Sequence, residues 1–229
     1  METNWKELKE NDDFYTAKYW EWQSTNVELG GKIQAECLFQ DYIKSSDVVL
    51  DFGCGSGTTL KNLKCKEKVG FEINPYAIKF NIQKNKIPTH SNLDELQDNY
   101  FDVIISNHAL EHTPTPYEDL LKLHSKLKKG GKIVIYVPSM EDELTKLKKQ
   151  KNKYDDTDRD NHLFNWNFQL LGNLLLKCKF KLLDAKTKAY SRTSLTDKAF
   201  VTGGKELFMK HATQENVHPQ TFVYGEKRI

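Results

Sequence analysis

The chain has 229 residues, and its 34 lysines and arginines against 32 aspartates and glutamates give a formal net charge of +2 at pH 7. That length predicts a single α/β domain and is short for two independent hydrophobic cores. The balanced charge gives no electrostatic reason to expect a nucleic-acid partner, and the lack of a run of about 18 apolar residues gives none to expect a membrane.

The cysteine spacing and the N-terminal segment predict the cellular compartment and the metal content. The four cysteines show no zinc-ligand spacing, so we expect reduced thiols and no metal site. Met1 opens a polar segment without the apolar core of a signal peptide, so we expect a cytoplasmic protein.

The N-terminal segment is aromatic. Residues 13–23 carry five aromatic side chains, among them Tyr19 and Trp22. This density favours a short helix folded back on the domain, and we predict that residues 1–31 form an arm over the functional site. The pair Gly30-Gly31 is expected to break the chain before a helix over 32–43.

A short apolar strand over 48–52 runs directly into a glycine-rich turn. In its sequence, VVLDFGCGSG, Asp51 precedes Gly53, Gly55 and Gly57. Glycine suits an abrupt strand-to-helix turn, because it adopts positive φ and lets a ligand approach the backbone amides. Asp51 can brace this loop or accept a hydrogen bond from a ligand ammonium group. A dinucleotide-binding turn, Gly-x-Gly-x-x-Gly, has a different spacing and lacks the preceding acid.

A second predicted strand, over 68–73, carries Glu72 near its end, 21 residues after Asp51. A carboxylate there is suited to accept hydrogen bonds from both ribose hydroxyls of an adenosine, and each such charge-assisted bond contributes roughly 1.5–3 kcal/mol. The alternative is a solvated glutamate at the end of a strand.

The rest of the pattern alternates helices and strands. We predict helices over 58–63, from Pro75 onward, over 117–127 and over 168–177, and strands over 86–90, 101–106, 132–137, 180–187 and 221–227. The alternation favours a doubly wound parallel α/β sheet. The glycine pair at 130–131 is expected to end the helix that begins at Tyr117.

Two segments are less regular. Residues 140–160 are dominated by charge, which favours a solvated helix and loop. Residues 188–220 are too long for a hairpin loop, so we predict an insertion, a lid or an oligomer contact before the last strand. The sequence leaves the oligomeric state open.

The glycine loop with its preceding acid resembles motif I of the class I S-adenosylmethionine-dependent methyltransferases, and the element order from residue 32 onward is similar to that fold. The resemblance implies a single methyltransferase domain over 1–229, with a Rossmann-like, doubly wound, mostly parallel seven-stranded sheet whose last strand is antiparallel. It implies S-adenosyl-L-methionine as cofactor and S-adenosyl-L-homocysteine as product.

Finer resemblances concern the acceptor. The segment Asn107-His-Ala-Leu-Glu-His112 resembles the Leu-Glu-His signature of the small-molecule branch. The segments at 19–23, 161–167 and 171–175 resemble a subgroup of bacterial and archaeal methyltransferases of surface-polysaccharide (capsule) biosynthesis. This implies a small sugar- or nucleotide-linked acceptor, with phosphoramidate modification as one example.

The resemblance also implies the cofactor contacts. The predicted cofactor-binding residues are Asp51, Gly53, Cys54, Gly55, Gly57, Glu72, Ile73, Asn92, Leu93, Asn107 and His108. The acid that usually contacts the adenine amino group is Asn92 here, so that hydrogen bond is expected from the Asn92 carbonyl or from Asp94.

His162 is the first candidate for a general base, because imidazole titrates near neutrality. The alternative for His162 is a loop histidine that holds a backbone carbonyl, and His108 and His112 compete for the catalytic role. His112 is expected either to contact the acceptor or, with Glu111, to begin a helix or brace the loop. The predicted acceptor-binding residues are Tyr19, Trp22, Gln23, His112 and Trp166, with core packing as the alternative for any one aromatic ring.

Two other classes of function share some of these features. An RNA or protein methyltransferase would share the loop, but the chain lacks the Asn-Pro-Pro-Tyr type of tetrapeptide and a basic surplus. A noncatalytic module could keep the fold and bind a partner.

Overall fold

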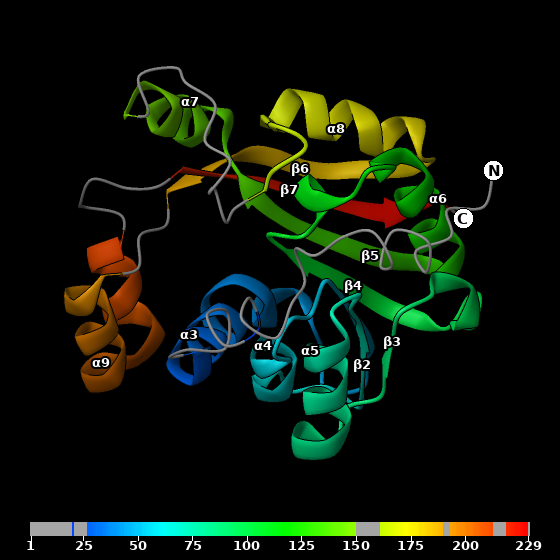
Figure 1. Ribbon diagram of the computed structural model, residues 1–229, viewed down its shortest axis with the longest axis horizontal. Helices are drawn as coiled ribbons and strands as arrows, with labels where there is room; N and C mark the ends of the chain where they lie inside the picture. Colours follow the sequence, from blue (N-terminus) through cyan, green and yellow to red (C-terminus); the bar gives the residue numbers. More distant parts are fainter. Residues whose placement is uncertain (1–19, 21–26, 150–160, 190–192, 213–218, 229) are drawn as a thin grey trace.

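The computed structural model describes Trp20 and residues 27–149, 161–189, 193–212 and 219–228. Within these residues, one sheet of seven strands has the order β3-β2-β1-β4-β5-β7-β6 (Figure 1). The strands are β1 (Val48–Phe52), β2 (Glu67–Phe71), β3 (Thr89–His90), β4 (Phe101–Asn107), β5 (Leu127–Pro138), β6 (Phe180–Ala189) and β7 (Pro219–Lys227).

Strand direction determines where a ligand can bind. Strands β1 to β5 pair in parallel, whereas β7 is antiparallel to both β5 and β6. The predicted fold class is therefore confirmed, including the antiparallel last strand. The strands that follow β1 are added on one side of it, as β2 and β3, and those from β4 onward are added on its other side. The strand order therefore reverses between β1 and β4. A crevice is expected at the carboxyl ends of the strands at such a switch point.

Helices cover both faces of the sheet. They are α3 (Val27–Gln34), α4 (Thr58–Asn62), α5 (Pro75–Phe80), α6 (Pro116–Lys126), α7 (Met140–Lys149), α8 (Phe168–Lys177) and α9 (Ser194–Ala212). The short π- and 3-10 helices are η2 (Ala35–Phe39), η3 (Gln40–Tyr42), η4 (Asn81–Asn85), η5 (Leu93–Glu95) and η6 (Leu110–His112). None of these described helices has both the length and the apolar composition that crossing a bilayer requires.

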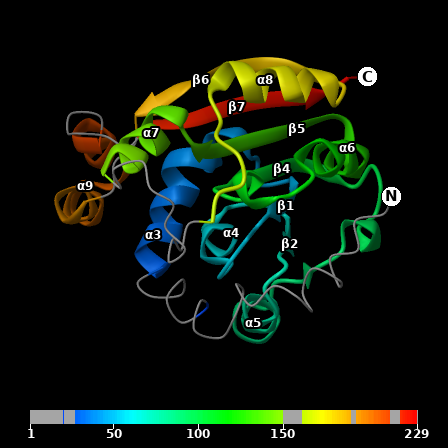
Figure 2. The ribbon, with the colours of Figure 1, turned by 45° about the horizontal axis from the view of Figure 1, so that its top comes forward.

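Two hydrophobic clusters hold the layers together. One cluster joins side chains of α6 and α8, such as Leu123 and Leu171, to one face of the sheet. The other joins α3, η2, α4 and α9 to the opposite face. Figure 2 shows α6 and α8 on one side and α3 and α4 on the other. Ile104 and Ile105 of β4 are both fully buried, as a parallel strand covered on two faces requires.

The predicted chain break at Gly30-Gly31 is wrong. Both glycines are buried inside α3, and the helical segment that they belong to continues through η2 and η3 to Tyr42. A Cβ on Gly31 would lie 2.5 Å from the Thr58 Cβ. Glycine here serves close packing of α3 against α4, rather than a turn.

Several predicted boundaries also move. The third strand is confined to Thr89–His90, and β2 ends at Phe71, so that Glu72 follows the strand. Helix α6 ends at Lys126, and the glycine pair at 130–131 lies inside the long strand β5 instead of ending the helix. The charged segment forms α7, as expected, over its described part.

The segment 188–220 contains a helix that is part of the core. Phe200, Phe208 and Ala212 of α9 belong to the same cluster as Ile33 and Phe39. A kink at Gly204, with φ 65°, divides α9. The possible role of this segment as a lid stays a prediction. Tyr19, Trp22 and Gln23 lie outside the described residues, and so does most of the arm predicted over 1–31.

Candidate functional site

The glycine loop between β1 and α4 has the conformation that its sequence predicts. Gly53, Gly55 and Gly57 have φ values of 79°, 50° and 68°. The amides of Gly53 and Cys54 both donate to the Phe71 carbonyl, at 2.9 and 3.0 Å. A Cβ on Gly53 would lie 2.2 Å from the Ala109 Cβ, so this position excludes any side chain.

Two asparagines that the sequence analysis did not single out hold the loop from behind. Asn81 Nδ2 donates to the Gly55 carbonyl and Asn85 Nδ2 donates to the Ser56 carbonyl, each at 2.8 Å. Asn81 is fully buried. The sequence signal was two amide side chains one helical turn apart in the segment after Pro75, but only the fold shows that they face the loop.

Two carboxylates lie at the base of the same loop. Glu72 Oε2 accepts from the Gly55 amide at 2.8 Å, and Oε1 accepts from the Ile73 and Asn74 amides at 2.8 and 2.9 Å. Asp51 is only 4% exposed. Burial, and next the neighbouring Glu72, raise the pKa of Asp51 from 3.8 to about 7. Glu72 thus stiffens the loop, and Asp51 is a buried acid that titrates near neutrality.

A cavity of about 260 Å³ lies between the glycine loop, α3 and the end of β4. The predicted cofactor residues among its lining are Asp51, Gly53, Cys54, Gly55, Asn107 and His108. Gly57, Glu72, Ile73, Asn92 and Leu93 are not among the lining residues. The α3 residues Val27, Gly30, Gly31 and Gln34 also line the cavity. Sequence reasoning missed this wall because it interpreted the glycine pair as a break.

The adenine contacts stay a prediction. Asn92 Oδ1 accepts from the Asp94 amide at 3.0 Å, which caps η5. Asp94 forms an ion pair with Lys122 at 2.8 Å, and Leu93 is buried. Both side chains proposed for the adenine amino group are therefore engaged within the protein.

The cavity suits the amino-acid part of an S-adenosylmethionine molecule. The Oδ1 atom of Asn107 is buried and accepts no hydrogen bond from the residues that the structure describes. Asp51 supplies a second acceptor in the same cavity. An ammonium group provides the donors that such acceptors need, and the bare backbone at Gly53 leaves room for it.

His108 stands at the cavity wall in a strained conformation. Its φ is 52°, which is uncommon for a residue with a side chain. Gln220 Nε2 lies 3.0 Å from His108 Nε2, so the ring nitrogen accepts from the amide. Burial, and next the neighbouring His162 and His112, lower the pKa of His108 to about 4. His108 is accordingly a neutral imidazole at pH 7.

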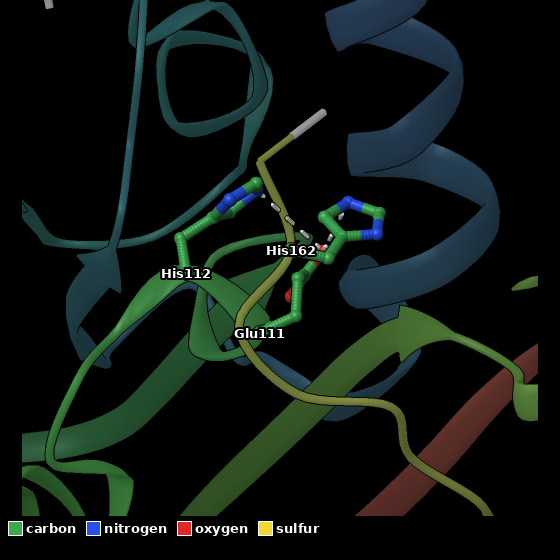
Figure 3. Close-up of side chains that lie close together, drawn as sticks. All are labelled: Glu111, His112 and His162. Carbon is green, nitrogen blue, oxygen red and sulfur yellow. Dashed lines mark ion pairs between the residues drawn. The ribbon is translucent and has the colours of Figure 1, made fainter. Parts of the chain in front are cut away.

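Behind His108, Glu111 lies among histidine side chains. His108 Nδ1, His112 Nε2 and His162 Nε2 are 3.7, 3.9 and 4.0 Å from Glu111 Oε1. Figure 3 shows the rings of His112 and His162 beside the Glu111 carboxylate. His162 Nδ1 also pairs with Glu143 Oε1 at 3.1 Å. Burial lowers the pKa of His162, but the hydrogen bond to Glu143 and the charge of Glu111 raise it by more. The pKa of His162 is therefore raised overall.

The structure brings the three predicted histidines together, whereas Trp166 packs in the hydrophobic core. Trp166 is 7% exposed, belongs to a core cluster and stacks with Phe164 at 5.6 Å between ring centroids. Its place accords with the packing alternative, and its contact with an acceptor stays a prediction. Sequence reasoning gave Glu111 only a bracing role, since no local signal shows that three rings converge on it.

Comparisons with known proteins agree with this geometry. A family model described as a methyltransferase domain matches residues 19–183. The chain matches curated relatives over 40% and 47% of their own length, so it spans less than half of each. One of these, an uncharacterized methyltransferase of Anoxybacillus flavithermus, is 35% identical over 100 residues, or 40% of this chain.

Solved structures show the same fold. An S-adenosylmethionine-dependent methyltransferase from Archaeoglobus fulgidus has a TM-score of 0.62 and 23% identity, covering 94% of this chain and all of that one. A phosphoethanolamine N-methyltransferase of Haemonchus contortus in complex with S-adenosyl-L-methionine has a TM-score of 0.61 and 15% identity, covering 99% of this chain and 60% of that one.

Proposed function

The chain belongs to the methyltransferase domain family, and on this premise we propose that it transfers a methyl group from S-adenosyl-L-methionine to a hydroxyl of a small metabolite. The observation that carries the proposal is a single cavity that contains Asp51, Asn107 and the neutral imidazole of His108. When bound, the cofactor supplies a methyl group already activated on a sulfonium. In the transfer, the acceptor oxygen forms a bond to the methyl carbon, the sulfur–methyl bond breaks, and the hydroxyl proton passes to a base.

The roles of this chain's residues follow from their positions. Asp51 and Asn107 offer oxygen acceptors to the ammonium group of the cofactor. The loop from Gly53 to Gly57 exposes backbone amides without side chains, and Glu72 is the proposed partner of the ribose diol. Asn92 and Leu93, after β3, are proposed to contact the adenine. Alignment of the acceptor against the methyl group contributes about 7–11 kcal/mol in comparable intramolecular reactions.

The base is proposed to be His108 or His162, and position favours His108. His108 lines the cavity, although its Nε2 must exchange the hydrogen bond from Gln220 for the proton, whereas His162 is not among the lining residues and is engaged with Glu143. A positioned base contributes roughly 10²–10⁴-fold to the rate, so a variant without it should retain measurable activity.

The proposed acceptor is a sugar- or nucleotide-linked metabolite of surface-polysaccharide biosynthesis, with phosphoramidate modification as one example. This acceptor is supported by the resemblance of the segment at 161–167 to enzymes of that kind, and this segment carries His162 to the edge of the site. Tyr19, Trp22, Gln23, His112 and Trp166 remain its proposed contacts.

The experiment that tests cofactor binding is calorimetry with S-adenosylhomocysteine and its 2′,3′-dideoxyribose analogue, on the native protein and Glu72→Ala. Loss of two charge-assisted hydrogen bonds should weaken S-adenosylhomocysteine binding at least about tenfold. Because Glu72 also holds the Gly55 amide, Glu72→Ala weakens both ligands somewhat. The penalty for removing the two ribose hydroxyls is the ratio of the affinities for S-adenosylhomocysteine and for the dideoxy analogue. If Glu72 binds these hydroxyls, the penalty should be smaller in Glu72→Ala than in the native protein.

Equal penalties in both proteins would remove the ribose role of Glu72. Failure of the native protein to bind S-adenosylhomocysteine would overturn the proposed function as a whole. Transfer of labelled methyl groups to small metabolites, to RNA or to protein in a lysate then distinguishes the acceptor classes, and the absence of transfer to any of them would favour a noncatalytic module.

A further inference from the structure

We propose that Glu111, His112 and His162 bind a divalent transition-metal ion beside the cofactor cavity. One nitrogen of each ring and one carboxylate oxygen lie within 4.8 Å of one another. The sequence predicts no metal here, because the three side chains come from two segments about 50 residues apart that only the fold brings together.

The first argument is the state of the Glu111 carboxylate. Glu111 is 1% exposed, and neither of its oxygens accepts a hydrogen bond from any part of the chain that the structure describes. The nearest histidine nitrogens are 3.7–4.0 Å from Oε1, which is too long for a hydrogen bond. Burial raises the pKa of Glu111 to about 7, because a buried carboxylate without donors is costly unless a proton or a cation compensates its charge.

The second argument is the orientation of the two rings. His112 Nδ1 lies 3.3 Å from the Asn161 carbonyl oxygen, and since a carbonyl only accepts, Nδ1 carries the proton. His162 Nδ1 pairs with Glu143 Oε1 at 3.1 Å, again an acceptor. In both rings Nε2 is the atom that faces Glu111 Oε1. Metal-binding histidines typically donate one ring N–H to a carbonyl or a carboxylate and offer the other nitrogen to the metal.

Backbone hydrogen bonds build the cluster. The Leu163 and Phe164 amides both donate to the Glu111 carbonyl, at 2.9 and 3.2 Å. They fix His162, the preceding residue, against η6, which carries Glu111 and His112. The rings of His112 and His162 are in edge contact, with centroids 4.9 Å apart (Figure 3).

The donor set indicates the kind of metal. Two imidazole nitrogens and one carboxylate oxygen suit zinc, iron, cobalt or nickel rather than calcium or magnesium. Metal–ligand bonds of about 2.0–2.2 Å place neighbouring ligand atoms about 3.4 Å apart in a tetrahedral site. The three side chains would therefore have to converge by roughly an ångström on the ion. Three protein ligands leave at least one position for a water or substrate oxygen.

The position relates the ion to the reaction. His108 lines the cofactor cavity, and its Nδ1 is 3.7 Å from Glu111 Oε1, so the ion would lie directly behind the cavity wall. An acceptor oxygen on the open coordination position would thereby be held beside the cofactor cavity. This role in acceptor binding rests on the proposed function, whereas metal binding itself does not.

Titration of the metal-free full chain with Co²⁺ and Zn²⁺, followed by visible absorption for Co²⁺ and by calorimetry for both, tests the site. We expect one ion per chain, and Glu111→Gln or His162→Asn should weaken its binding by more than about 100-fold, since loss of a second-shell partner alone costs 10–100-fold. His211→Asn, which removes an imidazole of α9 outside the cluster, should bind the ion as the native protein does.

The outcomes separate the two proposals. Native-like metal binding in both Glu111→Gln and His162→Asn, or no binding by the native protein, would overturn the site. S-adenosylhomocysteine binding by Glu111→Gln shows that this variant is folded. Glu72→Ala changes the glycine loop and leaves the three proposed metal ligands in place. Metal binding by this variant would support the metal site even if the cofactor proposal fails.

Discussion

The amide of Gly55 donates to the carboxylate of Glu72 at 2.8 Å, so the acid that follows β2 is a structural part of the loop that follows β1. The two segments at the switch point of the sheet are thereby one unit. A substitution in either segment is expected to alter the shape of the cavity as well as its individual contacts.

Gly53→Ala should reduce both stability and cofactor binding. A residue with a side chain at φ 79° costs about 1–2 kcal/mol, and its Cβ would also lie 2.2 Å from that of Ala109. We expect the loop to move and the affinity for S-adenosylhomocysteine to fall at least about tenfold, which corresponds to about 1.4 kcal/mol. Urea unfolding and calorimetry measure the two effects.

Gly130→Ala is the matched control. Gly130 has φ 73°, nearly the same strain, but a Cβ there would meet nothing within 4 Å. This variant should lose only the strain energy and should bind S-adenosylhomocysteine normally. Equal loss of stability and normal binding in both variants would show that the contact with Ala109 does not shape the loop.

Cofactor binding should depend on pH through Asp51. With a pKa of about 7, Asp51 is largely protonated at pH 6 and largely ionised at pH 7.5. If the ionised carboxylate accepts from the cofactor's ammonium group, the affinity for S-adenosylhomocysteine should rise over this range, by up to about tenfold. Calorimetry in buffers of different ionisation enthalpy should also detect proton release on binding near pH 6.5. In Asp51→Asn the affinity should be nearly constant with pH.

The same group predicts the sign of a stability change. Because the pKa of Asp51 is raised on folding from 3.8 to about 7, its protonated form stabilises the native state. That contribution is complete below pH 4 and is lost as the pH rises through 7. Asp51→Asn should therefore lose less stability than the native protein between pH 5 and 8. Parallel curves of unfolding free energy against pH for the two proteins would contradict the raised pKa of Asp51.

Helix α9 should behave as part of the core. Phe208 is fully buried, and Phe208→Ala should reduce the free energy of unfolding by about 3–5 kcal/mol, measured by urea denaturation. Val201, on the same helix, is 70% exposed, and Val201→Ala should change stability by less than about 0.5 kcal/mol. A small effect of both substitutions would mean that α9 packs only loosely on the domain.

Local patterns were sufficient for much of the fold. The apolar runs at 48–52 and 101–106 predicted buried parallel strands, and the acid and alternating glycines after the first run predicted the loop. These features are encoded within a few residues of one another. The methyltransferase family was predicted from them and is confirmed.

Features that depend on packing between distant segments were not predictable. A glycine pair looks the same whether it breaks a chain or admits a neighbouring helix, and only the approach of Thr58 distinguishes the two at Gly31. Likewise, Glu111 and His162 are 51 positions apart, and their juxtaposition depends on backbone hydrogen bonds to Leu163 and Phe164.

Helix α3 has two neighbours with different roles, because Gly31 borders the cofactor cavity while Lys32 places its ammonium 5.8 Å from the ring centroid of Phe200 in α9. If a ligand in the cavity stabilises α3, this contact extends the stabilisation to α9. Cavity occupancy and the stability of α9 would then be linked, so we expect amide protons of α9 to exchange more slowly when the cavity is filled.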